Sequence, residues 1–375
     1  MWKLKLKRRL KQPNLTDASP DALTCARQHG DTLYMGLANG VVEVMQSKPV
    51  LESGREWVTN YGFQAHRREF DYLESSDILE GIVCIEPIQD GGLGCVFATG
   101  NERTVKLWRS RTTEPTKNIL EKNKASEESK YPTPVNYIYT QKLIKELKNI
   151  HSYTLNSIQN QNEYLITADY LKISLWNVTR LDVSHTLVDI KPMRYEDLTH
   201  VITAARFHPT NPALLAYSTS RGDVTISDHR ARINPSTVLV LRSPGVSEYE
   251  LVRSVSDFRF CNENTVVTRD LVSLSLFDVR RPEAPIKTVE LFKEIDKIVD
   301  TNSIYEKFLV DTWGTQVVTG NFGGRFHVWD ILSDTLQDIK LEESPIEKRV
   351  RMVAMGENGL VIGYENYAFF YDFVN

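Results

Sequence analysis

One short pattern recurs along the chain and limits what it can fold into: two runs of alternating apolar and polar residues joined by a turn. Seven copies occur, at 34–45, 97–108, 166–176, 216–227, 267–277, 318–329 and 362–371. Their turns are rich in Gly, Asn, Asp and Ser, which tolerate positive φ or hydrogen-bond their own backbone. Each copy therefore predicts a β-hairpin, and a single hairpin cannot bury both of its faces.

The spacing of the copies predicts how the hairpins combine. Successive copies begin roughly 40–70 residues apart, and the lower end of that range is the period of a WD-repeat propeller blade. Blades stacked around an axis bury their faces against one another and leave only short edges. We therefore predict an all-β fold, a single seven-bladed WD-repeat propeller over residues 1–375. A generic antiparallel sandwich is the alternative, and seven similar hairpins argue against it.

The first ten residues predict how such a ring closes. Trp2, Leu4 and Leu6 alternate with lysines, which indicates a half-buried strand that keeps its charges in water. We expect this strand to complete the last blade by pairing near Ala368–Phe373. A nuclear-localisation or nucleic-acid-binding segment is the alternative interpretation of a basic run. The net charge of −4 does not favour a nucleic-acid partner.

Residues 111–150 depart from the repeat. The stretch from Thr112 to Pro134 is charged and poor in apolar residues, so burial cannot offset the entropy of ordering it. Apolar residues return at 135–147. Insertions in repeat proteins project from one face and often bind partners. We interpret 111–150 as an insertion between the second and third blades that forms an arm projecting from the second blade.

Composition and motifs favour a binding protein over an enzyme. The eight histidines show no H-x-x-x-H or H-E-x-x-H spacing, no G-x-S-x-G occurs, and Gly91-Gly-Leu-Gly94 lacks the context of a phosphate-binding loop. The four cysteines are scattered without a C-x-x-C pair, which predicts a reducing cytoplasmic or nuclear compartment and no zinc site. No stretch approaches about 18 apolar residues, so we expect no membrane partner. We predict no catalysis, no cofactor and no metal.

Several further motifs occur together in a characteristic order. They include Phe63-Gln-x-His66, Glu69-Phe-Asp-Tyr-Leu73, Val188-Asp-Ile-Lys-Pro192, Glu196-Asp-Leu-Thr199 and Phe207-His-Pro209. In this order they resemble the B-family, WD-repeat regulatory subunits of protein phosphatase 2A, over residues 60–110 and 150–335. No single motif decides the resemblance, which rests on their shared order.

The resemblance implies a non-catalytic targeting subunit of a Ser/Thr phosphatase holoenzyme. Such a subunit docks on a helical-repeat scaffold subunit, partly through its arm, and presents phosphoprotein substrates to the catalytic subunit. By position, the resemblance implies a top-face substrate groove formed by Glu69, Asp71, His151, Asp169, Tyr170, Tyr195, Glu196, Leu198 and Val201. It also implies a docking arm containing Tyr137, Ile138, Tyr139, Leu143 and Ile144. We expect Leu198 and Val201 to form an apolar anchor on one helical turn, because they are three residues apart.

The chain also departs from the family pattern. Tyr170 stands where the family has an acidic residue, Arg67 and Arg68 stand where it has acids, and the arm region is shorter. The short arm favours an alternative function, a WD-repeat adaptor of another complex that does not bind the phosphatase.

Overall fold

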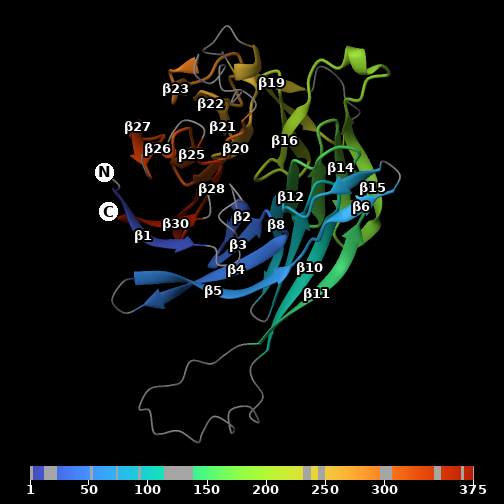
Figure 1. Ribbon diagram of the computed structural model, residues 1–375. Helices are drawn as coiled ribbons and strands as arrows, with labels where there is room; N and C mark the ends of the chain where they lie inside the picture. Colours follow the sequence, from blue (N-terminus) through green and yellow to red (C-terminus); the bar gives the residue numbers. More distant parts are fainter. Residues whose placement is uncertain are drawn as a thin grey trace, which may run out of the picture.

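The chain folds into seven four-stranded antiparallel sheets arranged as the blades of a β-propeller (Figure 1). The structure is a computed structural model. It describes residues 3–11, 23–50, 54–72, 75–91, 94–113, 138–230, 238–243, 250–295, 306–341, 348–364 and 367–374.

In the first six blades the strands follow chain order from the innermost to the outermost. The first blade contains β2 (Leu23–His29), β3 (Thr32–Leu37), β4 (Val41–Val50) and β5 (Gly54–Gln64). The second contains β8 (Cys84–Gly91), β9 (Gly94–Gly100), β10 (Val105–Thr113) and β11 (Ile138–Leu147). The third contains β12 (Ser157–Gln161), β13 (Tyr164–Ala168), β14 (Lys172–Asn177) and β15 (Arg180–Asp189). The fourth contains β16 (Ile202–Phe207), β17 (Leu214–Thr219), β18 (Asp223–Asp228) and β19 (Leu239–Arg242).

The remaining blades repeat the same order. The fifth contains β20 (Asp257–Phe260), β21 (Thr265–Arg269), β22 (Ser273–Asp278) and β23 (Lys287–Glu290). The sixth contains β24 (Val310–Trp313), β25 (Gln316–Gly320), β26 (Arg325–Asp330) and β27 (Thr335–Lys340). The seventh contains β28 (Met352–Gly356), β29 (Gly359–Tyr364), β30 (Tyr367–Val374) and β1 (Lys3–Lys11). A small hairpin of β6 (Glu69–Asp71) and β7 (Ser76–Ile78) lies between the first two blades in sequence.

The sequence-based prediction of the fold is confirmed. All seven repeated patterns form the middle two strands of a blade. The N-terminal strand β1 pairs antiparallel with β30, with Leu4 opposite Phe373 and Leu10 opposite Ala368, so the two ends of the chain share the last blade (Figure 1). This pairing closes the ring and covers the outer edge of β30 with β1.

The structure corrects the predicted place of the insertion. We predicted that residues 111–150 lie between the second and third blades, but β11 pairs along its length with β10 and is the outer strand of the second blade itself (Figure 1). Buried Val105 and Leu107 alternate on β10, and the end of β11 is anchored by buried Leu147. Residues 114–137 lie outside the described part of the chain.

The hydrophobic core lies between neighbouring blades. One cluster packs Leu33, Met35 and Met45 of the first blade against Val361 and Phe370 of the seventh. Similar clusters join the second blade to the third and the third to the fourth. Because each blade buries its faces against its neighbours, burial of apolar surface stabilises the ring as a whole.

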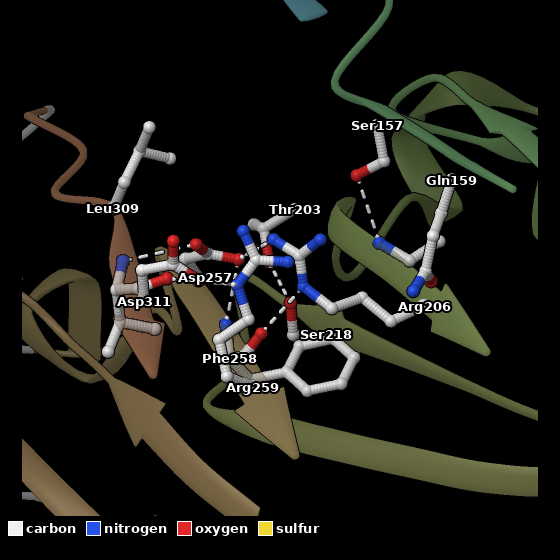
Figure 2. Close-up of polar contacts among 12 residues, drawn as sticks. Ser157, Gln159, Thr203, Arg206, Ser218, Asp257, Phe258, Arg259, Leu309 and Asp311 are labelled. Atoms are coloured by element: carbon white, nitrogen blue, oxygen red, sulfur yellow. Dashed lines mark hydrogen bonds and ion pairs between the residues drawn. The ribbon is translucent and has the colours of Figure 1, made fainter. Parts of the chain in front are cut away.

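Polar side chains also join the innermost strands, as Figure 2 shows near the propeller axis. The backbone N–H groups of Ala205 and Phe207 donate to the side-chain oxygens of Ser157 and Gln159, at 3.0 and 2.6 Å, which ties β16 to β12. These side chains connect blades that share no main-chain ladder among the described strands.

Asp311 connects three further blades at the axis. Its Oδ1 lies 3.3 Å from Arg259 Nε and 3.6 Å from Arg27 Nη1, and its Oδ2 accepts from the Met355 N–H at 2.9 Å. Arg27 continues to Glu86 of the second blade at 3.1 Å. Burial, helped by the nearby guanidinium groups of Arg206 and Arg27, lowers the pKa of Arg259 to about 9. The axis is thus lined by a network of paired charges.

Candidate functional site

The residues of the implied groove lie on connections at one end of the propeller. Strand direction alternates within a blade, so the turn between its second and third strands lies at the same end as the connection to the next blade. We call this end the top face. Glu69 and Asp71 lie on the β6–β7 hairpin, Tyr170 lies on the β13–β14 turn, and Tyr195 and Glu196 lie on the connection from β15 to β16.

Contacts between side chains bring these connections together. Lys148 Nζ lies 3.1 Å from Glu69 Oε2, which links the hairpin to the connection after β11. The hydroxyls of Tyr153 and Tyr195 lie 2.9 Å apart and link the connection after β11 to the connection between β15 and β16. The Ile202 N–H donates to the Tyr170 carbonyl at 2.7 Å. These contacts join the connections around the second, third and fourth blades. We call this part of the top face the top-face groove, after the groove that the resemblance implies.

Two of the implied groove residues are buried beneath this surface. His151 is 4% exposed and Asp169 is 1% exposed. His151 Nε2 lies 2.8 Å from Thr167 Oγ1, which also accepts from Trp176 Nε1 at 2.9 Å. His151 Nδ1 lies 3.1 Å from Asp169 Oδ2. The structure therefore gives His151 and Asp169 an internal, positioning role.

Asp169 shapes the turn that carries Tyr170. Its Oδ1 accepts from the N–H groups of Leu171 and Lys172, both at 2.7 Å. Burial alone would raise the pKa of Asp169, but the hydrogen bonds from His151 and these N–H groups lower it below its usual value. The ionised carboxylate fixes the turn, and through it the backbone of Tyr170.

The second blade contains a related arrangement that the sequence analysis missed. His66 Nε2 lies 2.9 Å from Thr99 Oγ1, and Trp108 Nε1 donates to the same oxygen at 3.0 Å. Asn101 occupies the turn position of Asp169 and accepts from the N–H groups of Arg103 and Thr104. The signal was present in the sequence, because a His, a Thr and a Trp recur in the same order in both blades.

The accessible part of the groove is acidic and aromatic. Tyr195 is 62% exposed and Glu196 is exposed, whereas Tyr170, Leu198 and Val201 are half-buried. The expected helical anchor is wrong in its geometry: the 3₁₀ helix covers only Tyr195–Asp197, and Leu198 is extended. Leu198 and Val201 therefore do not share a helical turn.

Cations partly neutralise the groove. Arg103 Nη1 lies 3.2 Å from Asp71 Oδ2, and Lys148 pairs with Glu69. Lys307 Nζ lies 4.8 Å from the centre of the Tyr170 ring. The hydrogen bond with Tyr153, together with nearby Lys191, lowers the pKa of Tyr195. Among the acidic residues of the implied groove, Glu196 is exposed and forms no ion pair within the described part of the chain.

Exposed aromatic residues extend the groove beyond the implied set. Phe70 is 47% exposed and Tyr72 is 88% exposed, and their rings meet edge to face at 5.2 Å. Met193, next but one to Tyr195, is fully exposed. Phe70 and Tyr72 alternate with Glu69 and Asp71 in the sequence. The motif that contains these two acidic residues therefore also contained the two exposed aromatic residues.

The described part of the arm carries an apolar edge. Ile138, Leu143 and Ile144 are 46%, 39% and 42% exposed, on the outermost strand of the second blade. Leu107 pairs with Lys145 and Trp108 with Leu143, so Ile144 is the extra residue of a β-bulge. Tyr139 packs against the Tyr61 ring at 4.9 Å. Tyr137 lies outside the described residues.

Neither a metal centre nor a membrane-spanning helix is found within the described residues. No group of three or more His, Cys, Asp or Glu side chains there could hold a metal ion. No helix in the same part of the chain is long and apolar enough to cross a membrane.

Comparison with known proteins identifies relatives along most of the chain. No protein-family model matches it. A B-type regulatory subunit of protein phosphatase PP2A from Candida tropicalis is 30% identical over 359 residues, which cover 87% of this chain and 70% of that protein. The serine/threonine-protein phosphatase 2A regulatory subunit phr2AB from Dictyostelium discoideum is 28% identical over 385 residues, covering 84% and 79%. The gamma isoform of the 55 kDa B-type regulatory subunit from Mus musculus is 29% identical over 356 residues, covering 86% and 79%.

A solved structure supports the fold independently of these relatives. Raptor from Chaetomium thermophilum superimposes with a TM-score of 0.62 at 12% identity, over 95% of this chain and 28% of that chain. This likeness concerns the fold alone. The sequence relatives are named as regulatory subunits, which supports the prediction that this chain is not an enzyme. With 30% identity over most of both proteins, the chain belongs to the B family of regulatory subunits of protein phosphatase 2A.

Proposed function

We propose that this chain is a targeting subunit of a Ser/Thr protein phosphatase, which recruits phosphoprotein substrates through its top-face groove. One observation carries the proposal: exposed Phe70 and Tyr72 lie on the connection before the second blade, and exposed Tyr195 and Glu196 lie on the connection after the third, both at the top face. Exposed carboxylates beside aromatic rings suit a segment with both basic and apolar side chains. A substrate held there would meet a tethered active site at a high effective concentration.

We propose that the apolar edge of β11 docks on the helical-repeat scaffold subunit, which in turn holds the catalytic subunit. Exposed Ile138, Leu143 and Ile144 support this part of the proposal, because an apolar patch on an outer strand is a common mark of an interface.

The groove is tested with charge reversal at a residue that contributes nothing to the core. Glu196→Arg should lower the amount of substrate phosphoprotein recovered with the chain by about tenfold, since it replaces attraction by repulsion for a basic segment. Glu163→Arg is the matched control, because Glu163 is also exposed but lies on the β12–β13 turn at the opposite end of the third blade. Equal recovery with both variants would refute the groove.

The docking edge is tested by affinity purification of the full chain from its own cells. Leu143→Glu with Ile144→Glu should abolish recovery of the scaffold and catalytic subunits. Val183→Glu is the control, since Val183 is 59% exposed on β15, the outer strand of the next blade. Point variants are preferable to deletion of the arm, which would remove β11 and its buried Leu147 from the second blade.

The same purification distinguishes the phosphatase-subunit function from the alternative, an adaptor of another complex. A chain that recovers other proteins through the top face, but no scaffold or catalytic subunit with any variant, would be an adaptor of another complex. The shorter arm in the sequence is the observation that favours this alternative.

A further inference from the structure

A cavity of about 440 Å³ lies at the sixth blade, away from the top-face groove of the second to fourth blades. Its walls come from the connection after β23, the β25–β26 turn and the two outer strands of the sixth blade. Phe292 and Phe322, whose rings are 5.0 Å apart, line one part of it, and His327, Asn321 and Arg325 line another. We call this cavity the sixth-blade pocket.

His327 offers the pocket an unused hydrogen-bond donor. The Asn321 amide nitrogen donates to the Leu291 carbonyl at 3.0 Å and lies 2.8 Å from His327 Nε2. His327 Nε2 is therefore the acceptor, which places the proton of the neutral ring on Nδ1. His327 is 4% exposed, its Nδ1 has no hydrogen-bond partner among the described residues, and its nearest carboxylate, Asp338, is 3.8 Å away.

A second buried polar group, Arg269, lies behind the pocket. Arg269 is fully buried and donates to the carbonyls of Ser273 and Gly320, both at 3.3 Å, while its Nε has no partner within the described part of the chain. Among the described residues, no carboxylate forms an ion pair with it. The adjacent Asp270 is occupied by the N–H groups of Val272 and Ser273. The Asp270 charge and the Phe308 ring, whose centre is 5.0 Å from the guanidinium carbon, offset part of the cost of burying this cation. A nearby anion would reduce that cost further.

Arg269 and the pocket act on each other electrostatically. Gly320, which accepts from Arg269, precedes Asn321 in the pocket wall. Burial lowers the pKa of His327 to about 4. The nearby Asp338 carboxylate opposes this shift, and the Arg269 and Arg325 guanidinium groups add to it. His327 is therefore a neutral donor at pH 7. His327 Nδ1 is thus an unsatisfied donor on a residue that lines the pocket, and Arg269 Nε is a second unsatisfied donor behind it, among the described residues.

The charges around the pocket favour an anion. Three cations, Lys293, Arg325 and Lys340, and two carboxylates, Glu294 and Asp338, line it, a difference of one positive charge. Behind the wall, the buried Arg269 is offset in charge by Asp270. A phosphate monoester carries nearly two negative charges near pH 7 and several acceptor oxygens, whereas a carboxylate carries one. The aromatic rings of Phe292 and Phe322 suit an apolar group attached to the phosphate.

We propose that the sixth-blade pocket binds a phosphate monoester, with His327 Nδ1–H and Arg325 donating to its oxygens. The ester is either a phosphorylated protein side chain or a free small molecule, and both carry the same group. This inference does not depend on the proposed role of the top-face groove, which lies on other blades.

Calorimetric titration of the full chain with phenyl phosphate, at fixed ionic strength and without phosphate in the buffer, tests the pocket. We expect saturable binding of one equivalent, and about tenfold weaker binding for Arg325→Gln, which removes a charge-assisted hydrogen bond from a half-buried position. Arg230→Gln is the control, since Arg230 pairs with Asp228 on the fourth blade as Arg325 pairs with Asp338. No saturation at millimolar concentration, or equal binding by Arg325→Gln, would overturn the proposal.

Histidine side-chain NMR locates the bound group in the unsubstituted protein. With ¹⁵N-labelled histidine, phenyl phosphate should shift the Nδ1–H signal of His327 and leave that of His151 unchanged. A shift at His151 alone would overturn the proposal. A phosphoserine peptide and its unphosphorylated form then identify the source. Binding of only the phosphorylated peptide indicates a protein ligand, and binding of phenyl phosphate but neither peptide indicates a small molecule.

Discussion

Arg206 on β16 donates to Asp257 on β20 at 2.5 Å, across the junction between the fourth and fifth blades, with both side chains nearly buried (Figure 2). Asp257 also accepts from the Val310 N–H of the sixth blade at 3.1 Å. One carboxylate therefore connects three blades that are separate sheets. Such contacts replace, at the axis, the main-chain ladder that holds each blade together.

Asp257→Asn should destabilise the propeller by about 3 kcal/mol, because it leaves the buried Arg206 charge without its counter-ion. Urea unfolding followed by circular dichroism measures the change. Asp228→Asn, which breaks the exposed pair with Arg230, should have little effect. A similar loss from both variants would show that the buried pair has no special role.

Stability should fall with acid between about pH 6.5 and 4. Burial and nearby Lys106 lower the pKa of His66 to about 3, and burial foremost lowers that of His327 to about 4. In this range the unfolded chain binds protons that the folded chain does not, so stability is complete above pH 6.5 and is lost as the pH falls. Each histidine contributes a slope of about 1.4 kcal/mol per pH unit.

His66→Asn tests this assignment, since it removes one of the two groups. The dependence of unfolding free energy on pH should become shallower by about half, when measured by urea unfolding at several pH values. An unchanged slope would mean that His66 is not the titrating group.

Thr167→Val should weaken substrate recruitment through the top-face groove without changing any exposed residue. Thr167 Oγ1 serves both His151 and Trp176, and its loss leaves their buried polar atoms unsatisfied at a cost of about 2 kcal/mol. Because His151 contacts Asp169, which fixes the Tyr170 turn, the groove should lose order. Thr186→Val, on the outer strand β15, is the control for the substitution itself. Unchanged substrate recovery by Thr167→Val would show that the contacts among His151, Thr167 and Trp176 do not influence binding in the groove.

Gly320→Ala should be the more damaging of two glycine substitutions in the sixth blade. A Cβ at Gly320 would lie 1.7 Å from the Val350 carbonyl oxygen, so the backbone must move, and a loss of about 3 kcal/mol or more is expected. Gly314 has φ +59° with open space around it, so Gly314→Ala should cost only about 1 kcal/mol of backbone strain. Thermal unfolding of both variants measures the difference, and the reverse order would contradict the packing described here.

The sequence by itself determined the hairpins, their number and the closure of the ring. Alternating residues around Gly- and Asn-rich turns encode a hairpin within a dozen residues, so local pattern is sufficient. The pairing of β1 with β30 was predictable because a ring needs a partner for its last blade. Family membership was likewise readable from the order of short motifs, which comparison with the relatives supports.

Only the tertiary structure decided which polar residues face solvent. His151 and Glu196 both stood in one implied groove, yet blade stacking buries the first and leaves the second exposed. Arg269 and His327 are 58 positions apart, and nothing local to either predicts that they meet beside one pocket. Burial and charge compensation depend on how neighbouring blades pack, which is a long-range property that no short stretch of sequence contains.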